Sequence, residues 1–400
     1  MSSKHELKQV LVVGSGVAGT RAAETLRKEG YDGALTIVGA ERHAPYHRPP
    51  LSKKLLTGKV ERAGVDLAPQ LDVEARVLRE ASAVRLDLRK CTVGVLDGDR
   101  EQELGFDGLV IASGATPRQW PAPVPDGVFV LRTVDDCLAI RERLDANPRV
   151  VVIGGGFIGA EVAATSRSLG LDVVLIERAA GPLLPALGEE MAHRYAELHR
   201  RHGVDVRLNV SVDSFVGEGH VKAVRLTDGS EVKADLVVIG LGVTPCTDWL
   251  DGSGLRIDDG VLCDASCAVE GAMNIVAAGD VARWWHPLYE THLRIEHWDH
   301  AARQGAAAAR TLLAGPGQGD AYNEVPYFWS DQYDVKLQML GVPRDYDTMQ
   351  VIEGDADSWH FLAAYGRNGH TIAVVSTILG RVQAYRGAIA DRAEFPPQVR

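Results

Sequence analysis

Two glycine-rich runs about 140 residues apart have the residue types and spacing best suited to chemistry. The runs Gly14–Gly19 and Gly154–Gly159 both follow the pattern G-x-G-x-x-G. Gly14 and Gly154 permit a tight turn, the middle glycine lets the backbone approach a pyrophosphate, and the last lets a helix pack closely on a strand. The following helix directs its unpaired N–H groups at the phosphates. Two such motifs predict two dinucleotides in one chain, and therefore an electron relay.

An acidic residue follows each motif at the distance expected for binding a ribose. Glu177 lies 23 residues beyond Gly154, and its carboxylate would repel the 2′-phosphate of NADPH, so NADH is favoured. The neighbouring Arg178 could accommodate that phosphate, which keeps NADPH open. Glu41 follows the second strand of the first unit, where it would bind a ribose hydroxyl or be a solvated loop carboxylate.

A proline-containing stretch at residues 45–53 carries two fixed positive charges, Arg48 and Lys53. Its adjacent prolines, Pro49 and Pro50, predict a stiff, non-helical segment, and a helical pattern that ends at Gly58 follows it. No cysteine precedes Cys91. We interpret this stretch as the floor of a flavin pocket from which electrons leave one at a time.

The elements that must position these residues are predicted by hydrophobic pattern. Short apolar runs typical of buried parallel strands precede or follow each glycine motif, at residues 10–13, 35–38, 106–112, 150–153, 173–176 and 235–240. Alternation over residues 84–96 predicts antiparallel strands, and segments from residue 328 to 385 predict a small α+β domain with an antiparallel sheet. We therefore expect an α/β protein with two Rossmann-like units and a C-terminal α+β domain.

Two further turns carry side chains of interest. A strand over residues 274–278 leads into Gly279 and Asp280, and this acid could accept from a ribityl hydroxyl or cap the next helix. Trp298 lies just before an alanine-rich helix that runs through Leu313, and Asp299 is predicted to be its cap. The helix dipole would then direct positive charge at whatever Trp298 contacts.

Composition narrows the function classes. The 400 residues allow two to three domains, and a net charge of −11 argues against a nucleic-acid-binding protein. No apolar run approaches the ~18 residues of a membrane helix, and a first glycine motif so near the start predicts no signal peptide. Five cysteines without a Cys-x-x-Cys pair predict reduced thiols in a cytoplasm. Cys263 and Cys267 could form half of a metal site, but no second pair accompanies them, so we expect no metal.

Together these motifs resemble the ferredoxin reductases of bacterial oxygenase systems, which are FAD- and NADH-dependent enzymes with a glutathione-reductase-like fold. The resemblance covers essentially the whole chain. It rests on both glycine motifs, Arg48–Lys53, Ala278-Gly279-Asp280, Glu296-His297-Trp298 and Phe328-Trp329-Ser330-Asp331-Gln332. The chain departs from the family at His47, where an aspartate is usual. Disulfide reductases with such an N-terminal unit carry a redox cysteine in this part of the chain, and its absence here favours a one-electron acceptor.

The resemblance implies a domain layout and a set of site residues. It implies an FAD domain at residues 1–117 and 246–322, an NAD domain at 118–245 and a C-terminal domain at 323–400. It implies Lys53 and Glu161 as an ion pair beside the flavin N5 atom, with Trp298 also taking part in catalysis. The residues implied for FAD are Gly14, Gly16, Ala18, Gly19, Glu41, Arg48, Lys53, Ala112, Asp280, Glu296, Trp298 and Trp329. Those implied for NAD are Gly154, Gly156, Phe157, Ile158, Gly159, Glu177 and Gly242.

The implied partner is a 2Fe–2S ferredoxin that serves an oxygenase, and the implied enzyme is a cytoplasmic monomer or weak dimer. Other interpretations stay open. Lys53 could be a solvated charge, Glu161 could favour a helix dipole, and Phe157 and Trp329 could be core aromatics. The chain could instead be a rubredoxin reductase, an NADH oxidase, or a redox sensor like apoptosis-inducing factor, whose Glu-His-His-Asp-His signature nearly matches residues 296–300.

Overall fold

A computed structural model describes residues 7–68 and 73–398, and the chain divides into two compact units. The first unit consists of residues 1–47, 66–116 and 244–324, and the second of residues 48–65, 117–243 and 325–400. In this division, residues 48–65 belong with the second glycine motif, and so do the last 76 residues (325–400). The chain therefore leaves and re-enters the first unit twice before it ends in the second.

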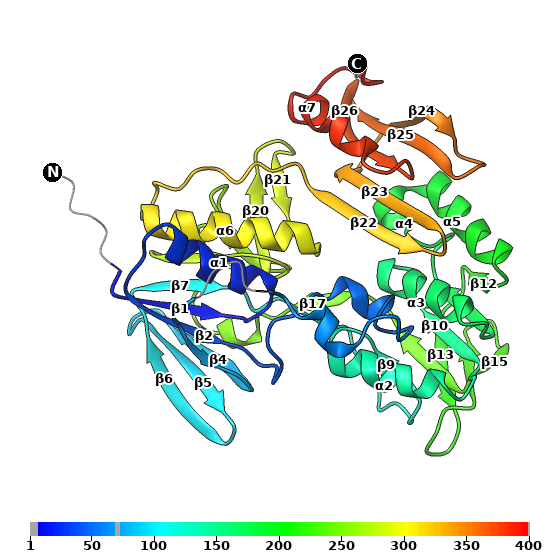
Figure 1. Cartoon of the computed structure of the whole chain (residues 1–400), viewed down its shortest axis with the longest axis horizontal. Coiled ribbons are helices and arrows are strands. Elements are labelled where there is room, and N and C mark those ends of the chain that lie inside the picture. The colour runs from blue at the N-terminus through cyan, green and yellow to red at the C-terminus, as the bar shows by residue number, and fades with distance from the viewer. Residues whose placement is uncertain (1–6, 69–72, 399–400) are drawn as a thin grey trace. The chain divides into compact units, whose positions relative to one another are not determined.

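A five-stranded parallel sheet forms the centre of the first unit, in the order β19-β7-β1-β2-β3. Its strands are short and nearly free of polar residues, which suits strands buried on both faces. Helices α1 and α6 lie together on one side of this sheet (Figure 1). The bounds are β1 (Gln9–Val13), α1 (Val17–Lys28), β2 (Ala34–Val38), β3 (Arg76–Leu78), β7 (Gly108–Ile111), β19 (Ile275–Ala277) and α6 (Trp298–Ala314).

The first unit also contains two three-stranded sheets, and β8 pairs with β17 in a two-stranded sheet. The antiparallel sheet β4-β5-β6 confirms the strands predicted from the alternation at residues 84–96, and β20 of the second small sheet pairs with β18 and β21. The bounds are β4 (Ala81–Asp87), β5 (Thr92–Asp97), β6 (Arg100–Gly105), β8 (Ala115–Pro117), β17 (Val243–Pro245), η3 (Asp248–Leu250), β18 (Val261–Cys263), β20 (Ala282–His286) and β21 (Thr291–Leu293).

The second unit repeats the parallel arrangement with the order β12-β11-β10-β16-β9. Helix α3 follows β10 as α1 follows β1, so both predicted Rossmann-like units are confirmed. The bounds are η1 (Pro49–Ser52), η2 (Arg62–Val65), β9 (Val128–Val130), α2 (Val134–Leu144), β10 (Val150–Ile153), α3 (Phe157–Ser168), β11 (Val173–Glu177), α4 (Leu184–Leu187), α5 (Glu189–Arg201), β12 (Asp205–Leu208), β13 (Val212–Val216), β14 (Ala223–Leu226), β15 (Glu231–Lys233) and β16 (Leu236–Ile239).

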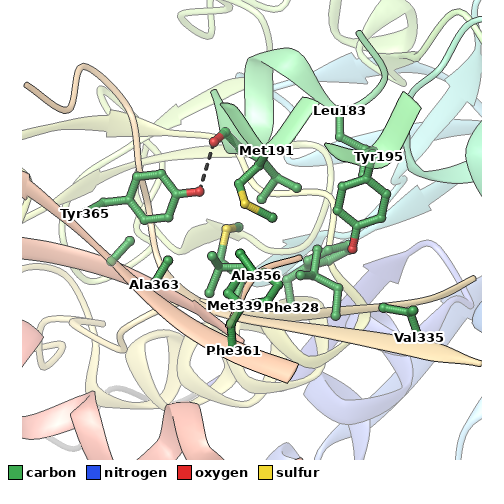
Figure 2. Close-up of a cluster of buried hydrophobic side chains, with 14 of the residues drawn as sticks. Leu183, Met191, Tyr195, Phe328, Val335, Met339, Ala356, Phe361, Ala363 and Tyr365 are labelled. Atoms are coloured by element: carbon green, nitrogen blue, oxygen red, sulfur yellow. Dashed lines mark hydrogen bonds between the residues drawn. The ribbon is translucent and has the colours of Figure 1, made fainter. Parts of the chain in front are cut away.

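A five-stranded antiparallel sheet, β22-β23-β26-β25-β24, confirms the predicted C-terminal α+β region. Its apolar side chains share one core with α4 and α5, and the Tyr365 hydroxyl donates to the Leu187 carbonyl at 2.9 Å (Figure 2). This buried contact fixes the sheet against the preceding part of its unit. The bounds are β22 (Tyr327–Gln332), β23 (Val335–Gly341), β24 (Thr348–Asp355), β25 (His360–Arg367), β26 (His370–Ser376), η4 (Arg381–Tyr385) and α7 (Arg386–Ala390).

The proline stretch differs from its prediction. Pro49–Ser52 forms a 3₁₀ helix with prolines at its first two positions, where a missing N–H costs nothing. Hydrogen-bonded turns, not a regular helix, occupy residues 53–58. Both the non-helical prediction and the following helix are therefore wrong. Among the described residues, no helix is long and apolar enough to cross a membrane.

Candidate functional site

The first glycine motif forms a tight turn that only glycine can make. Gly14 has φ +117°, and a Cβ there would lie 2.0 Å from the Ala112 carbonyl oxygen. Ala112 directly follows the neighbouring strand β7 and donates its N–H to the Val13 carbonyl at 2.7 Å. A Cβ on Gly19 would lie 1.9 Å from the Gly14 carbonyl oxygen, so α1 begins in direct contact with its own turn.

The second position of the motif is open. Gly16 is the N-cap of α1, no side chain caps the helix, and nothing lies within 4 Å of the place a Cβ would take. The space beside Gly16 at the start of α1 is therefore not filled by protein, which suits a pyrophosphate that approaches the helix N-terminus. A cavity of about 240 Å³ lies beside this turn. Its walls include Ser15, Thr20, Glu24, Ile37, His43 and Arg79.

Glu41 is half-buried and accepts a hydrogen bond from the Tyr46 hydroxyl. Tyr46 is itself buried and forms a β-bridge with Asp66. This partnership fixes Glu41 in place, so it is not simply a solvated loop carboxylate. Ala18 has different surroundings, at the contact between α1 and α6. The backbone of Gly305 on α6 comes so close that a Cβ there would lie 2.2 Å from the Ala18 carbonyl oxygen.

Asp280 follows the carboxyl end of β19, the edge at which α/β sheets bind ligands. The next element is strand β20, so the alternative that Asp280 caps a helix is wrong. Gly279 has φ +79°, and its N–H donates to Gln304 Oε1 at 2.8 Å. The side chain of Gln304, which is fully buried on α6, therefore holds the turn that presents Asp280.

Trp298 is the first residue of α6, and its N-cap is His297. The prediction that Asp299 caps the helix is wrong, because the helix begins one residue earlier and Asp299 pairs with Arg303 at 2.8 Å. Trp298 Nε1 is buried and has no hydrogen-bond partner among the described residues. Its indole lies 5.1 Å from the His47 imidazole, centroid to centroid, at 34°.

His47 occupies the position where the family has aspartate, and its ring is thus a direct neighbour of Trp298. Burial and the nearby Arg21 lower its pKa below the ordinary value of 6.5. A neutral imidazole beside an indole is compatible with a bound aromatic ring. Glu296 is exposed and pairs with Arg294 at 2.6 Å.

The second glycine motif repeats the first almost atom for atom. Gly154 has φ +98°, and a Cβ on Gly159 would lie 1.9 Å from the Gly154 carbonyl oxygen. Gly156 is the N-cap of α3, and the nearest atom to its absent Cβ is the Gly240 carbonyl oxygen at 4.0 Å. This turn, too, is open where a pyrophosphate would pass.

The carboxylate of Glu177 accepts two backbone hydrogen bonds, from Gly155 N–H at 2.6 Å and Ala179 N–H at 2.8 Å. It therefore lies directly beside the turn that precedes α3. Three other positions border open space: Ile158 is 44% exposed, Gly242 is exposed with φ +85°, and Arg178 is exposed. The predicted NAD-binding residues are thus gathered at one edge of the parallel sheet.

Lys53 and Glu161 form a buried ion pair, with Nζ 2.6 Å from Oε2 and side chains 16% and 4% exposed. Glu161 is the fifth residue of α3, beyond the first turn, so the interpretation as a favourable charge at the helix start is wrong. The interpretation of Lys53 as a solvated charge is also wrong. The ammonium donates further to the Pro49 carbonyl at 3.0 Å.

Two serines that sequence reasoning missed complete this cluster. Ser52 Oγ donates to Glu161 Oε2 at 2.5 Å, and Ser330 Oγ donates to Glu161 Oε1 at 2.7 Å. Ser330 lies inside the Phe328–Gln332 stretch that carries the resemblance, but nothing in its spacing indicates a partner 169 residues away.

Aromatic residues of the second unit lie close to α3. Phe157 is half-buried, with its ring centroid 3.9 Å from that of Phe328, and Trp329 is half-buried beside Tyr327 at 5.9 Å. Arg48 donates to the Arg132 carbonyl at 2.6 Å. The residues implied for FAD are thus divided, with Arg48, Lys53 and Trp329 in the second unit and the rest in the first.

These features fit the two cofactors. The open glycine turns suit two pyrophosphates, the cavity beside Ser15 can admit part of a nucleotide, and the unpartnered indole N–H of Trp298 can donate to a ligand. The cysteines are all free thiols, and Cys263 and Cys267 are fully buried. Among the described residues, no three metal-ligating side chains gather.

Comparison with known proteins identifies the family. A family model described as pyridine nucleotide-disulphide oxidoreductase matches residues 8–305, and one described as reductase C-terminal matches residues 327–399. The chain is 38% identical over 404 residues to the ferredoxin–NAD(+) reductase component of the anthranilate 1,2-dioxygenase system of Burkholderia cepacia, which covers 97% of this chain and 95% of the relative.

One further relative and one solved structure support the same family. The putidaredoxin reductase of Pseudomonas putida is 34% identical over 409 residues, with coverage of 98% of this chain and 93% of the relative. Among solved structures, the covalent putidaredoxin reductase–putidaredoxin complex matches with a TM-score of 0.90 and 32% identity, covering 96% of this chain and 93% of the other. The resemblance to ferredoxin reductases of oxygenase systems is confirmed. The chain belongs to the pyridine nucleotide-disulphide oxidoreductases, and it is an oxidoreductase that uses FAD and NAD(H).

Proposed function

We propose that this protein passes electrons from NADH through FAD, one at a time, to a 2Fe–2S ferredoxin that serves an oxygenase. The observation that carries the proposal is the buried Lys53–Glu161 pair in a stretch that lacks any cysteine. Cys137 lies beside this stretch, where its thiol donates to the Leu51 carbonyl at 3.1 Å, but it is a free, buried thiol whose pKa burial raises to about 12. The described residues therefore offer no disulfide there to receive the electrons. The names of the relatives, which are ferredoxin–NAD(+) reductases, support the same acceptor.

We assign one nucleotide to each of the two open glycine turns. Gly14, Gly16 and Gly19 would bind the FAD pyrophosphate at the start of α1, with Glu41 at a ribose and Asp280 at the ribityl chain. Gly154, Gly156 and Gly159 would bind NADH, and Glu177 would accept from its ribose hydroxyls. A carboxylate there repels the extra phosphate of NADPH, which favours NADH. Gly242 and Ile158 would border the same nucleotide.

Bound FAD supplies the chemistry of accepting hydride from NADH and releasing single electrons. The side chains of this chain set the electrostatics. Lys53 would hold positive charge beside the flavin, while Glu161 keeps the ammonium in place at 2.6 Å. Phe157 would shield the ring until the nicotinamide arrives, and Trp298 and Trp329 would contact it. Positive charge from the start of α6 would add to that of Lys53.

For these roles we propose a domain layout with FAD at residues 1–117 and 246–322, NAD at 118–245, and a C-terminal domain at 323–400. We further propose that the protein works in the cytoplasm as a monomer or weak dimer. Arg303, Arg310 and Arg344 are candidate contacts for an acidic ferredoxin.

The decisive experiment is NADH-driven reduction of cytochrome c, with and without candidate 2Fe–2S ferredoxins from the same genome. We expect rapid turnover only when ferredoxin is present. Turnover with oxygen alone would indicate an NADH oxidase, and turnover only with rubredoxin would indicate a rubredoxin reductase. A long-lived charge-transfer complex that ferredoxin does not re-oxidise would indicate a redox sensor.

A further inference from the structure

The C-terminal sheet contacts helix α3 through one face of β22. Burial alternates along this strand, so Phe328, Ser330 and Gln332 share its buried face. Phe328 contacts Phe157, and Ser330 donates to Glu161. Phe157 and Glu161 are four residues apart on α3, which is a rise of about 6 Å, while two strand residues span about 6.8 Å. The strand and the helix therefore meet in register at two points.

A third contact continues the same helix face. Thr165 is four residues beyond Glu161, and its hydroxyl donates to the Ser52 carbonyl at 2.8 Å. Ser52 in turn donates to Glu161 Oε2. The residues Ser52, Glu161 and Ser330 are all buried. Water therefore does not compete effectively for these hydrogen bonds.

The hydrogen bonds run in one direction. Gln332 Nε2 donates to Ser330 Oγ at 3.3 Å, which leaves the Ser330 proton for Glu161 Oε1 at 2.7 Å. Lys53 and Ser52 both donate to the other oxygen, Oε2. Among the described residues, every hydrogen bond to the Glu161 carboxylate thus comes from a donor, and the arrangement complements a carboxylate anion. Ser330 fixes the one oxygen that the other two donors leave free.

We propose that Ser330, oriented by Gln332, is a positioning residue of the reductase: it fixes the Glu161 carboxylate and, through it, the Lys53 ammonium. The C-terminal sheet thereby sets the position of the charge in the active site. This inference rests on the proposed function only for its kinetic consequence, since the contacts belong to the folded chain. Ser330 acts through Glu161 and does not itself need to touch a substrate or cofactor.

The test measures acylation of Lys53 in the flavin-bound protein by mass spectrometry, relative to the exposed neighbour Lys54 as internal reference. Ser330→Ala should raise Lys53 acylation about three- to tenfold, because an amine that is released from its ion pair loses protection. Ser330→Thr keeps the hydroxyl and should restore the wild-type value. Ser330→Cys, a weaker donor of similar size, should give an intermediate value and serves if the alanine variant does not fold.

The matched control is Ser376→Ala. Ser376 is a fully buried serine of the same sheet whose hydroxyl donates to the Phe361 carbonyl at 2.8 Å, away from Glu161. Its loss should lower the melting temperature without changing Lys53 acylation. Equal acylation of wild type and of the folded Ser330 variants overturns the proposal. An equal rise in Ser376→Ala also overturns it, because that rise would reflect general loosening.

A second readout separates this inference from the proposed function. In stopped-flow experiments, Ser330→Ala should slow flavin reduction at saturating NADH about tenfold, which corresponds to ~1.4 kcal/mol, with unchanged NADH affinity. If wild type itself does not reduce its flavin with NADH, the proposed function fails, and acylation still tests the positioning. If wild type does so and Ser330→Ala matches it in rate and acylation, only the positioning role fails.

Discussion

The helices that follow the two glycine motifs share a backbone geometry but differ at their fifth residue. That residue is Arg21 in α1 and Glu161 in α3. Arg21 pairs with Glu24 on its own helix at 2.5 Å. Glu161 pairs with Lys53, which is 108 residues away, and accepts from Ser330, which is 169 residues away. The charge of the fifth residue is therefore paired within its own helix in α1, whereas in α3 it is connected to distant segments.

The largest difference should appear in stability. Glu161→Ala should lower the free energy of unfolding by about 3 kcal/mol, because it leaves the largely buried Lys53 without its carboxylate. Arg21→Ala should cost less, about 1 kcal/mol. Although the Arg21–Glu24 pair is equally buried, it joins neighbours on one helix, and Glu24 borders a cavity that water can enter. Guanidinium chloride unfolding measures both. Equal losses would contradict the distinction between the two helices.

The connection to Lys53 should also appear in kinetics. Lys53→Ala should slow flavin reduction by NADH at least about tenfold while FAD stays bound, because the positive charge beside the flavin is lost. Stopped-flow absorbance gives the rate, and the visible spectrum gives the FAD content. Lys54→Ala is the control, since this neighbour is exposed. An unchanged rate in Lys53→Ala would remove the proposed role.

The shared geometry of the two turns can be used to separate their ligands. Gly16→Ala should weaken FAD binding about tenfold and leave NADH binding unchanged, whereas Gly156→Ala should do the reverse. Both added methyl groups enter open space, so the fold should be kept. Gly19→Ala and Gly159→Ala are the contrasting controls, because each Cβ would meet a carbonyl oxygen at 1.9 Å. Loss of both ligands in one open-turn variant would contradict the assignment.

The two units should differ slightly in how much folding stability they lose at acidic pH. Burial lowers the pKa of His286 to about 4 and of His300 to about 3 in the first unit, and of His199 to about 4 in the second. The unfolded chain binds protons below its ordinary histidine pKa of about 6.5, but the folded chain does not, so stability falls as pH decreases from there towards 4 or 3.

Each such histidine should cost about 1.2 kcal/mol between pH 6 and pH 5, so the first unit should lose about 1 kcal/mol more than the second. Hydrogen-exchange mass spectrometry, corrected for the intrinsic effect of pH, measures each unit separately. His300→Gln should reduce the difference. A larger acid loss in the second unit would contradict the expectation.

Local pattern was sufficient to predict the central parallel strands, both turns and the antiparallel C-terminal sheet, because each depends on neighbouring residues. The short outer strands β3, β9 and β12 were not predicted. Gly14 and Gly154, for example, take the positive φ values that their motif requires. The errors came where two local rules compete. Pro49 and Pro50 exclude a regular helix interior but fit the first positions of a 3₁₀ helix, and Asp299 is a good cap that lies one residue inside α6.

The candidate site was less accessible to sequence reasoning. Lys53 and Glu161 were paired only through the family resemblance, and Ser52 and Ser330 were not predicted at all. Their contacts depend on how α3, η1 and β22 pack together, and no sequence spacing encodes an approach between residues 109 to 169 positions apart. Gln304 escaped notice for the same reason, because its partner Gly279 belongs to a different element.

The contact between α1 and α6 has a consequence for how the chain acquires its structure during synthesis. The backbone of α6 at Gly305 touches α1 at Ala18, and β19 completes the sheet that β1 begins. The parallel sheet of the second unit, by contrast, is encoded entirely within residues 128–239. During synthesis on the ribosome, the first unit therefore cannot complete its folding until β19 and α6 have been made, which is after the sheet of the second unit. Until then its apolar strands stay uncovered. This nascent N-terminal segment is where we expect chaperones to bind.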